Sequence, residues 1–199
     1  MDVVIRFDTP KPESLLYLLE EMYDDPFVGV TIDHPLSKAE WVANKLKYVQ
    51  ERYDQNIIST VAYVGSGIVG IAFSRPVGLI QGKCSNLKLG SDYWKMGNFY
   101  VLKEYRGKGI GKASLKAFVE HMKGRVSYFA EIQNETSNAL AVSAGLTLTH
   151  KFQQLLYSNE IRVLPLDGSI VRSPSRVYNV YFAEIPSDDE LENPAIMKK

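Results

Sequence analysis

Residues 99–112 read FYVLKEYRGKGIGK and join two segments with different periodicities. Before them, residues 98–102 are rich in β-forming side chains and predict a strand. After them, the apolar residues of 112–123 recur at helical spacing and predict an amphipathic helix. The alternating glycines in between let successive backbone N–H groups point inward, at the positive end of the helix dipole. Three basic side chains add charge that favours a di- or pyrophosphate ligand: Arg106, Lys108 and Lys112.

Glycine spacing separates three kinds of phosphate-binding loop. The pattern GxxxxGK[ST] fails because Ala113 follows the pair Gly111-Lys112. The dinucleotide pattern GxGxxG fails because its third glycine would fall on Lys112 or on Ser114. The pattern Q/R-x-x-G-x-G/A fits, as Arg106-x-x-Gly109-x-Gly111. The alternative to phosphate binding is a structural turn with solvated lysines.

Outward from this loop, the chain predicts an α/β (α+β) fold that mixes hairpins with crossover connections. We expect strands at 3–7, 58–64, 68–74, 98–102, 126–132, 146–157 and 176–185. We expect helices at 13–22, 37–53, 112–123 and 134–145. No linker or internal repeat interrupts residues 1–185, which predicts one domain followed by a flexible C-terminal tail over 186–199.

Local signals mark several element ends. Ser37-Lys38-Ala39-Glu40 has the pattern of a capping box and predicts a helix start. Gly65-Ser66-Gly67 predicts a hairpin turn. Asn134 is a favourable N-cap, and Gly145 stands where a helix is expected to end.

Composition excludes several classes of protein. The chain has 199 residues, of which 45% are hydrophobic and 23% charged, so disorder, collagen and coiled coil are poor interpretations. The single cysteine, Cys84, has no internal disulfide partner, and the three histidines form no metal-ligand cluster, so no metal is expected. No secretory signal or membrane-spanning run is recognisable. We therefore expect a soluble, cytoplasmic protein that binds no membrane.

The zero net charge hides an uneven distribution. Residues 1–60 carry 11 acidic and 6 basic side chains, whereas residues 101–125 carry 2 acidic and 7 basic ones. The basic surplus coincides with the glycine loop and the helix that follows it. The acidic N-terminal third favours a cationic partner, such as an amine.

The glycine loop resembles that of the GNAT superfamily of acyl-CoA-dependent N-acyltransferases. Val101 and the segment Tyr105-Arg106-Gly107-Lys108-Gly109-Ile110-Gly111 look like its "V…YRGKGIG" segment. Asn134-x-x-Ser137-Asn138 through Gly145-Leu146 is similar to its second motif, N-x-x-S…G-F, with leucine in place of phenylalanine. The resemblance implies a mixed, mostly antiparallel sheet with helices on both faces. It also implies an N-acetyltransferase that uses acetyl-CoA as its co-substrate.

The resemblance further implies roles for individual residues. The backbone amides of 106–111 would hold the pyrophosphate of coenzyme A, and the main chain of 99–101 would pair with its pantetheine arm. Asn134 would contact the same arm, and N-capping of the following helix is its alternative role. The implied cofactor-binding residues are Phe99, Tyr100, Val101, Arg106, Gly107, Lys108, Gly109, Ile110, Gly111, Lys112 and Asn134.

The catalytic residues are implied less directly. Many family members have a tyrosine acid four residues before the glycine of the second motif, but Ala141 stands there. The pattern instead resembles that of ribosomal-protein Nα-acetyltransferases, in which the motif serine protonates the leaving thiolate; this nominates Ser137. Glu131 is the candidate base. The alternatives are a serine that satisfies the first helical turn and an ordinary exposed glutamate.

The acceptor is left open by the sequence. A small amine, a protein N-terminus or a lysine would each fit, and Tyr93-Trp94 is a candidate wall of the acceptor site. A catalytically silent acyl-CoA sensor or partner-binding module is the second hypothesis. A third is an enzyme that modifies a nucleic-acid base, although no separate nucleic-acid-binding motif favours it. A homodimer also stays an open alternative.

Overall fold

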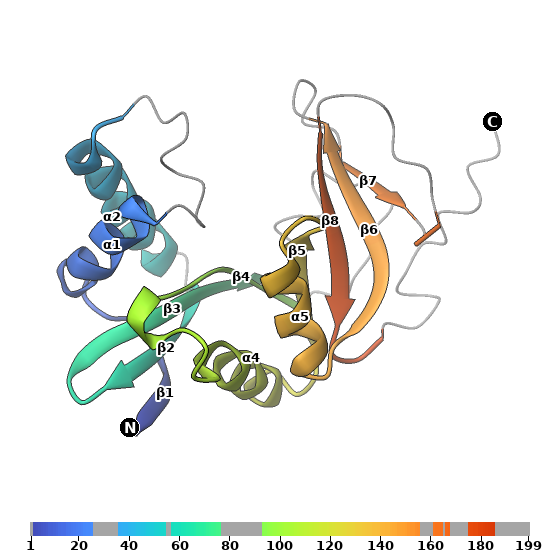
Figure 1. The fold of residues 1–199 in the computed structure, drawn as a ribbon, viewed down its shortest axis with the longest axis horizontal. Coiled ribbons are helices and arrows are strands. Elements are labelled where there is room, and N and C mark those ends of the chain that lie inside the picture. Colours follow the sequence, from blue (N-terminus) through green and yellow to red (C-terminus); the bar gives the residue numbers. More distant parts are fainter. Residues whose placement is uncertain are drawn as a thin grey trace. The chain divides into compact units, whose positions relative to one another are not determined.

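The computed structural model describes residues 2–25, 36–54, 57–76, 93–155, 161–164, 166–167 and 175–185 (Figure 1). The chain forms two compact units. The first contains residues 1–74 and 98–114, and the second contains residues 75–97 and 115–199. Strand β4 (Trp94–Val101) and helix α4 (Ile110–His121) each begin in one unit and end in the other.

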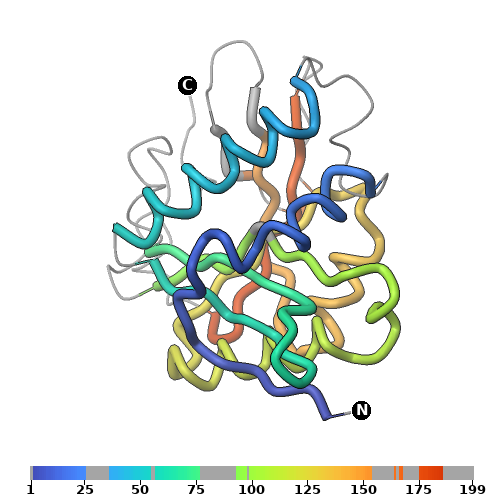
Figure 2. Tube along the Cα trace, turned by 90° about the vertical axis from the view of Figure 1, so that its left-hand side faces the viewer, coloured from blue at the N-terminus to red at the C-terminus, as the bar shows by residue number. Residues whose placement is uncertain are grey.

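The first unit is built on an antiparallel meander. Strands β1 (Val3–Asp8), β2 (Ile58–Val64) and β3 (Gly67–Pro76) follow one another in the sheet. The end of β4 adjoins β3, where Leu102 N donates to Val69 O at 2.9 Å. Figure 2 shows helix α2 (Lys38–Asp54) running beside α1 (Leu16–Asp24), which continues the short 3-10 helix η1 (Pro12–Leu15).

The predicted capping box is confirmed at the start of α2. Ser37 N donates to Glu40 Oε2 at 2.9 Å, and Ser37 Oγ donates to the same oxygen at 2.6 Å. Glu40 N donates back to Ser37 Oγ at 3.4 Å, and this reciprocal bond pairs a backbone group that a helix end would otherwise leave unpaired. Trp41 on α2 packs edge-to-face on Tyr23, with ring centres 5.7 Å apart, and thereby joins the two helices. The core of the first unit includes Leu15, Leu18, Trp41, Val49, Val61, Ile71, Tyr100 and Ile110.

The second unit places the last strand in the middle of its sheet. The start of β4 pairs parallel with β5 (Val126–Glu131), and β8 (Ser175–Phe182) pairs antiparallel with β5 and with β6 (Thr147–Leu155). Strand β7 (Ile161–Leu164) lies at the edge beside β6. Helix α5 (Glu135–Ser143) contacts β5 and β6.

The hydrogen-bonded strand order is β1-β2-β3-β4-β5-β8-β6-β7. Only the pairing of β4 with β5 is recorded as parallel among the described strand pairs. The predicted α/β fold with a mixed, mostly antiparallel sheet is therefore confirmed. In the described ranges, no helix is both long and apolar enough to cross a membrane.

Some element boundaries differ from those predicted. Strand β4 begins at Trp94, four residues before the strand predicted at 98–102, and α4 begins two residues early, at Ile110. Strand β7 was not predicted, because four residues give too short a pattern to recognise. The predicted tail over 186–199 lies outside the described residues.

Tyr93 is a core residue, so the prediction that it lines an acceptor site is wrong. Its side chain is fully buried, and its ring meets that of Phe182 edge-to-face at 6.0 Å. Arg125 Nη1 donates to its hydroxyl at 2.6 Å, which gives the buried oxygen a partner. The burial of Tyr93 could not be predicted from the sequence, because the neighbouring residues show no clear hydrophobic periodicity.

Candidate functional site

The glycine loop has the backbone conformation that its sequence requires. It follows the short 3-10 helix η3 (Lys103–Tyr105). Gly107 and Gly109 adopt φ values of +72° and +79°, in the left-handed region that favours glycine. The first bond of α4 runs from Ala113 N to Gly109 O at 2.9 Å. Since helical N–H groups donate four residues back, those of 110–112 have no partner within the helix and are directed out of its N-terminal end.

The loop exposes its charged residues, and a buried residue at the start of α4 anchors it to the core. Gly107, Lys108 and Gly109 are exposed, and Lys108 Nζ lies 5.1 Å from the centre of the Tyr105 ring. Lys112 is also exposed, in the first turn of α4. Ile110, by contrast, is buried in the core of the first unit. The N-terminus of α4 is thus fixed to the core while its N–H groups and two lysines face outward.

Arg106 is turned back into the protein. Its Nε donates to Val101 O at 2.9 Å, and its guanidinium forms an ion pair with Asp25, 81 residues away in the chain. The guanidinium carbon also lies 5.2 Å from the centre of the Tyr100 ring. Burial, with the nearby Asp25 charge next in importance, raises the pKa of Tyr100. No sequence signal pointed to Asp25, because this contact depends on the tertiary fold.

The predicted strand residues expose little side chain. Tyr100 and Val101 are buried, and Phe99 packs against the same core from a partly buried position. Their main chain, rather than their side chains, is what a ligand could pair with. One acceptor is already engaged, because the Val101 carbonyl holds Arg106.

A pocket of about 690 Å³ lies in the first unit, beside η3. None of the predicted site residues lines it. Its lining combines three tyrosines with an apolar floor and one charged residue of each sign: Tyr17, Tyr63, Tyr105, Leu18, Ile68, Val69, Leu102, Lys11 and Glu104, with Pro10, Ser14, Ser66 and Gly67. The pocket therefore borders the residues that precede the loop and does not include the loop itself.

In the second unit, the second-motif residues lie at the start of α5. Asn134 is the N-cap of α5, and its Oδ1 accepts a hydrogen bond from Ser137 N at 2.9 Å. Asn134 N in turn donates to Glu131 O at 2.9 Å. The structure therefore brings together Glu131, Asn134 and Ser137, and it confirms the capping role of Asn134.

The side-chain amide of Asn138 hydrogen-bonds α5 to the sheet through both its NH2 group and its oxygen. Its Nδ2 donates to Glu131 O at 2.9 Å and to Asn134 O at 2.8 Å. Its Oδ1 accepts from Asn179 Nδ2 at 2.8 Å and from the Tyr181 hydroxyl at 2.7 Å, both on β8. Three of these four hydrogen bonds fix the first turn of α5, and Ser137 with it, to β5 and β8, and the fourth lies within the helix cap.

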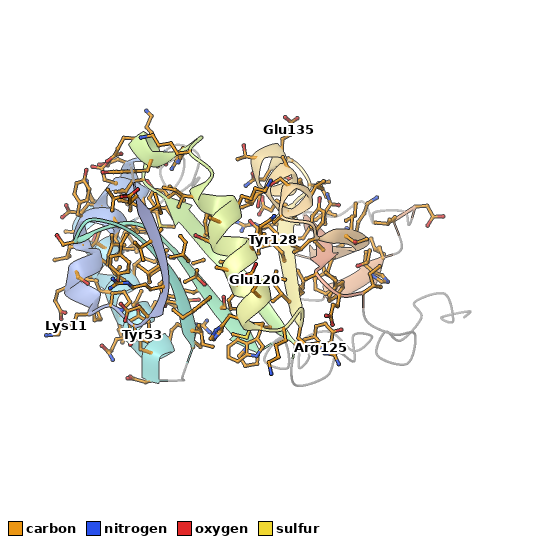
Figure 3. All side chains as sticks on the ribbon, turned by 90° about the horizontal axis from the view of Figure 1, so that it is seen from below. Lys11, Tyr53, Glu120, Arg125, Tyr128 and Glu135 are labelled. Carbon is orange, nitrogen blue, oxygen red and sulfur yellow. The ribbon has the colours of Figure 1, made fainter. Side chains whose placement is uncertain are left out.

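Ser137 also meets a buried tyrosine that sequence reasoning missed. The oxygen of the Tyr128 hydroxyl lies 2.7 Å from Ser137 Oγ. Figure 3 labels Tyr128 on β5 and Glu135 in the first turn of α5. Burial raises the pKa of Tyr128, and its hydrogen bond with Ser137 opposes that rise only partly. Tyr128 therefore stays protonated at neutral pH.

Glu131 has partners of its own. Its Oε2 accepts from Gln133 Nε2 at 2.8 Å, and its Oε1 lies 3.7 Å from Arg176 Nη1. The side chain is 32% exposed, so the carboxylate is within reach of solvent. If Glu131 is the base, the proton that it accepts competes with Arg176 for the carboxylate oxygen.

Lys95 is a third residue, after Asp25 and Tyr128, that the sequence did not single out. It lies on β4, with Nζ 4.2 Å from the centre of the Phe129 ring. Burial, and then repulsion from Arg75, lower the pKa of Lys95 to about 7 from the ordinary 10.5. A lysine in an otherwise aromatic sequence, Tyr93-Trp94-Lys95, is the only signal that could have marked it.

Replacing Lys95 with methionine is expected to stabilise the protein at acidic and neutral pH. Because its folded pKa lies below its unfolded pKa, the unfolded chain binds the proton better, and wild-type stability rises between about pH 7 and pH 10.5. The gain from the substitution is largest below pH 7, where its upper limit is about 5 kcal/mol, at about 1.36 kcal/mol per pKa unit. Urea unfolding of both proteins across this pH range measures it.

The matched control is Lys116→Met, at an exposed position on α4. This variant should keep the wild-type dependence of stability on pH. A constant difference between Lys95→Met and wild type at every pH would contradict the assignment.

In the described ranges, no group of three or more His, Cys, Asp or Glu residues is placed to hold a metal ion.

Comparison with known proteins adds independent information. The family model described as "Acetyltransferase (GNAT) family" matches residues 16–145. No curated protein matches the chain.

Several solved structures have the same fold. The ribosomal-protein-alanine N-acetyltransferase from Brucella melitensis is 19% identical, with 89% of this chain and 97% of that chain covered and a TM-score of 0.58. RimL, a ribosomal L7/L12 α-N-protein acetyltransferase solved with coenzyme A, is 16% identical, with 90% and 92% covered and a TM-score of 0.57. The microcin C7 self-immunity acetyltransferase MccE, in complex with acetyl-CoA and AMP, is 16% identical, with 90% and 91% covered and a TM-score of 0.56. At these identities the likeness shows the fold alone.

Proposed function

The chain belongs to the acetyltransferase (GNAT) family, and we propose that it transfers an acetyl group from acetyl-CoA to a primary amine by direct attack. One observation carries the proposal: two left-handed glycines turn the chain so that the unpaired N–H groups at the start of α4 face outward beside Lys108 and Lys112. Such a helix end is suited to a pyrophosphate. The coenzyme A and acetyl-CoA bound by RimL and MccE support the same cofactor.

The loop and the strand before it would bind different parts of coenzyme A. The amides of 106–111 would hold the pyrophosphate, and Lys108 and Lys112 would add charge at its rim. The main chain of Phe99, Tyr100 and Val101 would pair with the pantetheine arm, as the family resemblance implies. Asn134, whose side-chain oxygen already caps α5, would contact the arm through its remaining amide donors.

The transfer needs two proton movements. The amine nitrogen attacks the thioester carbonyl, and strand amides stabilise the oxygen anion that forms. The excess proton on nitrogen passes to Glu131, directly or through water, as the carbon–sulfur bond breaks. Ser137 donates its hydroxyl proton to the departing thiolate. No covalent enzyme intermediate is involved.

The contact with Tyr128 supports Ser137 as the acid. Tyr128 is 4% exposed, and a buried hydroxyl left without an acceptor is costly. Of the groups in the described ranges, Ser137 Oγ is the hydrogen-bond partner of this hydroxyl, and either oxygen can be the donor. With Tyr128 as the donor, the Ser137 proton is directed away from Tyr128 and is available to another group.

The acceptor is a small amine, a protein N-terminus or a lysine. Two structural neighbours are acetyltransferases of ribosomal proteins by their names, which favours a protein acceptor without identifying it. A cytoplasmic location, where acetyl-CoA is available, completes the proposal.

Incubation with acetyl-CoA and a panel of amines, peptides and oligonucleotides tests the proposed function. We expect coenzyme A to raise the melting temperature, and mass spectrometry to find one amine class that gains an acetyl group while free thiol appears. A thermal shift without transfer to any acceptor would favour the sensor hypothesis. Transfer to an oligonucleotide alone would favour base modification, and no thermal shift would contradict cofactor binding.

A further inference from the structure

The arginine of the glycine motif is bound to a buried carboxylate. Asp25, the C-cap residue that follows α1, is 5% exposed, and a carboxylate so buried must be paired with a positive charge or neutralised. Arg106 supplies that charge through its Nη2, while its side chain stays 31% exposed. The guanidinium is therefore already compensated within the first unit.

We propose that Asp25 is a positioning residue for the cofactor loop: it holds Arg106 so that the guanidinium fastens the loop to the end of β4. Arg106 then supports the loop structurally, as a strut, and does not bind the phosphates. This inference rests on the proposed binding of coenzyme A by the loop, and it assigns the phosphate-facing charge to Lys108, Lys112 and the N–H groups of α4.

The geometry explains why the loop needs such a strut. The hydrogen bond from Arg106 Nε to Val101 O spans six residues, from the last residue of β4 to the first of the loop. Beyond it, Gly107, Lys108 and Gly109 are exposed, and a Cβ placed at either glycine would meet no atom within 4 Å. The exposed turn has no packing of its own, so its direction is set by its two ends. Ile110 fixes one end in the core, and the pair Asp25–Arg106 fixes the other.

A neutral double variant separates this role from direct phosphate binding. Asp25→Asn and Arg106→Gln each remove one charge of the ion pair and so release the hold on the loop, and each should weaken coenzyme A binding about tenfold in isothermal titration calorimetry. The double variant Asp25→Asn/Arg106→Gln leaves no unpaired charge, and glutamine can still donate to Val101 O. Its Kd should return to within about threefold of wild type, because the two effects are strongly coupled. The dependence of its Kd on salt should match that of wild type.

Asp24→Asn is the matched control. Asp24 precedes Asp25 and pairs with Lys38 at 2.5 Å in an exposed position, so its loss removes an ion pair from the same helix end. The Kd should be unchanged, and circular dichroism with thermal unfolding checks the fold of every variant.

Three results would overturn the inference. If Arg106 binds the phosphates, Asp25→Asn frees it and tightens binding, and the double variant is as weak as Arg106→Gln with a reduced dependence on salt. If the pair serves folding alone, the melting temperature falls in the single variants while the Kd does not change. If wild type itself fails to bind coenzyme A, the proposed function falls and the inference with it.

Discussion

Gly109→Val is expected to weaken the binding of coenzyme A by about 10- to 100-fold, because a β-branched residue in the left-handed region costs about 1–3 kcal/mol. Gly109 has φ +79° and its carbonyl accepts the first bond of α4. To relieve this strain, the backbone at residue 109 would rotate. The N–H groups of 110–112, which follow it, would then change direction. A Cβ there meets no atom within 4 Å, so a clash is not the cause. Calorimetric titration with coenzyme A measures the loss.

Gly65→Val is the matched control for this effect. Gly65 lies in the β2–β3 turn with φ +59°, and a Cβ there also meets no atom within 4 Å. Both variants should lose thermal stability to a similar degree, but only Gly109→Val should lose affinity. An equal loss of affinity in both variants, or no loss in either, would contradict the assignment of the loop.

Ser137→Ala should lower kcat about 100-fold with little change in the KM for acetyl-CoA, since removal of a proton donor costs about 10²- to 10⁴-fold. The substitution is well suited to the question, because Asn134 caps α5 through the backbone N–H of Ser137, which alanine keeps. Tyr128→Phe leaves the serine in place and removes only the hydroxyl that orients it. It should lower kcat less than Ser137→Ala, and the double variant should be no worse than Ser137→Ala alone.

Ser143→Ala provides the comparison on the same helix. Ser143 Oγ donates to Leu140 O at 2.9 Å, an ordinary helical contact of an exposed serine. Steady-state kinetics with the acceptor found in the panel should show wild-type kcat for this variant. If Ser137→Ala is equally active, the leaving thiolate takes its proton from another source.

Local sequence patterns account for much of the fold. The capping box at Ser37, the hairpin turn at Gly65 and the N-cap at Asn134 each depend on contacts within a few residues, and each is present in the structure. The order of the strands does not follow from such patterns. Insertion of β8 between β5 and β6 depends on pairings such as Ser127 with Phe182, which the chain separates widely.

The same distinction holds for the site. The glycine loop was predictable because spacing alone specifies its backbone. The partners of its side chains were not, because Asp25 reaches Arg106 across 81 residues and Tyr128 meets Ser137 only once α5 lies on β5. The burial of Tyr93 is a third example, since it depends on Phe182 from the far end of the chain.

The central place of β8 bears on how the chain folds as it is synthesised. All residues of the first unit have been made once Ser114 has been added, so its meander and helices can form early. The second unit has to wait, because β5 and β6 both use β8 as their neighbour. Until the ribosome releases residues 175–182, these two strands have unpaired edges, which are prone to aggregation. Of the described strands, the last to leave the ribosome is therefore the one that completes the sheet.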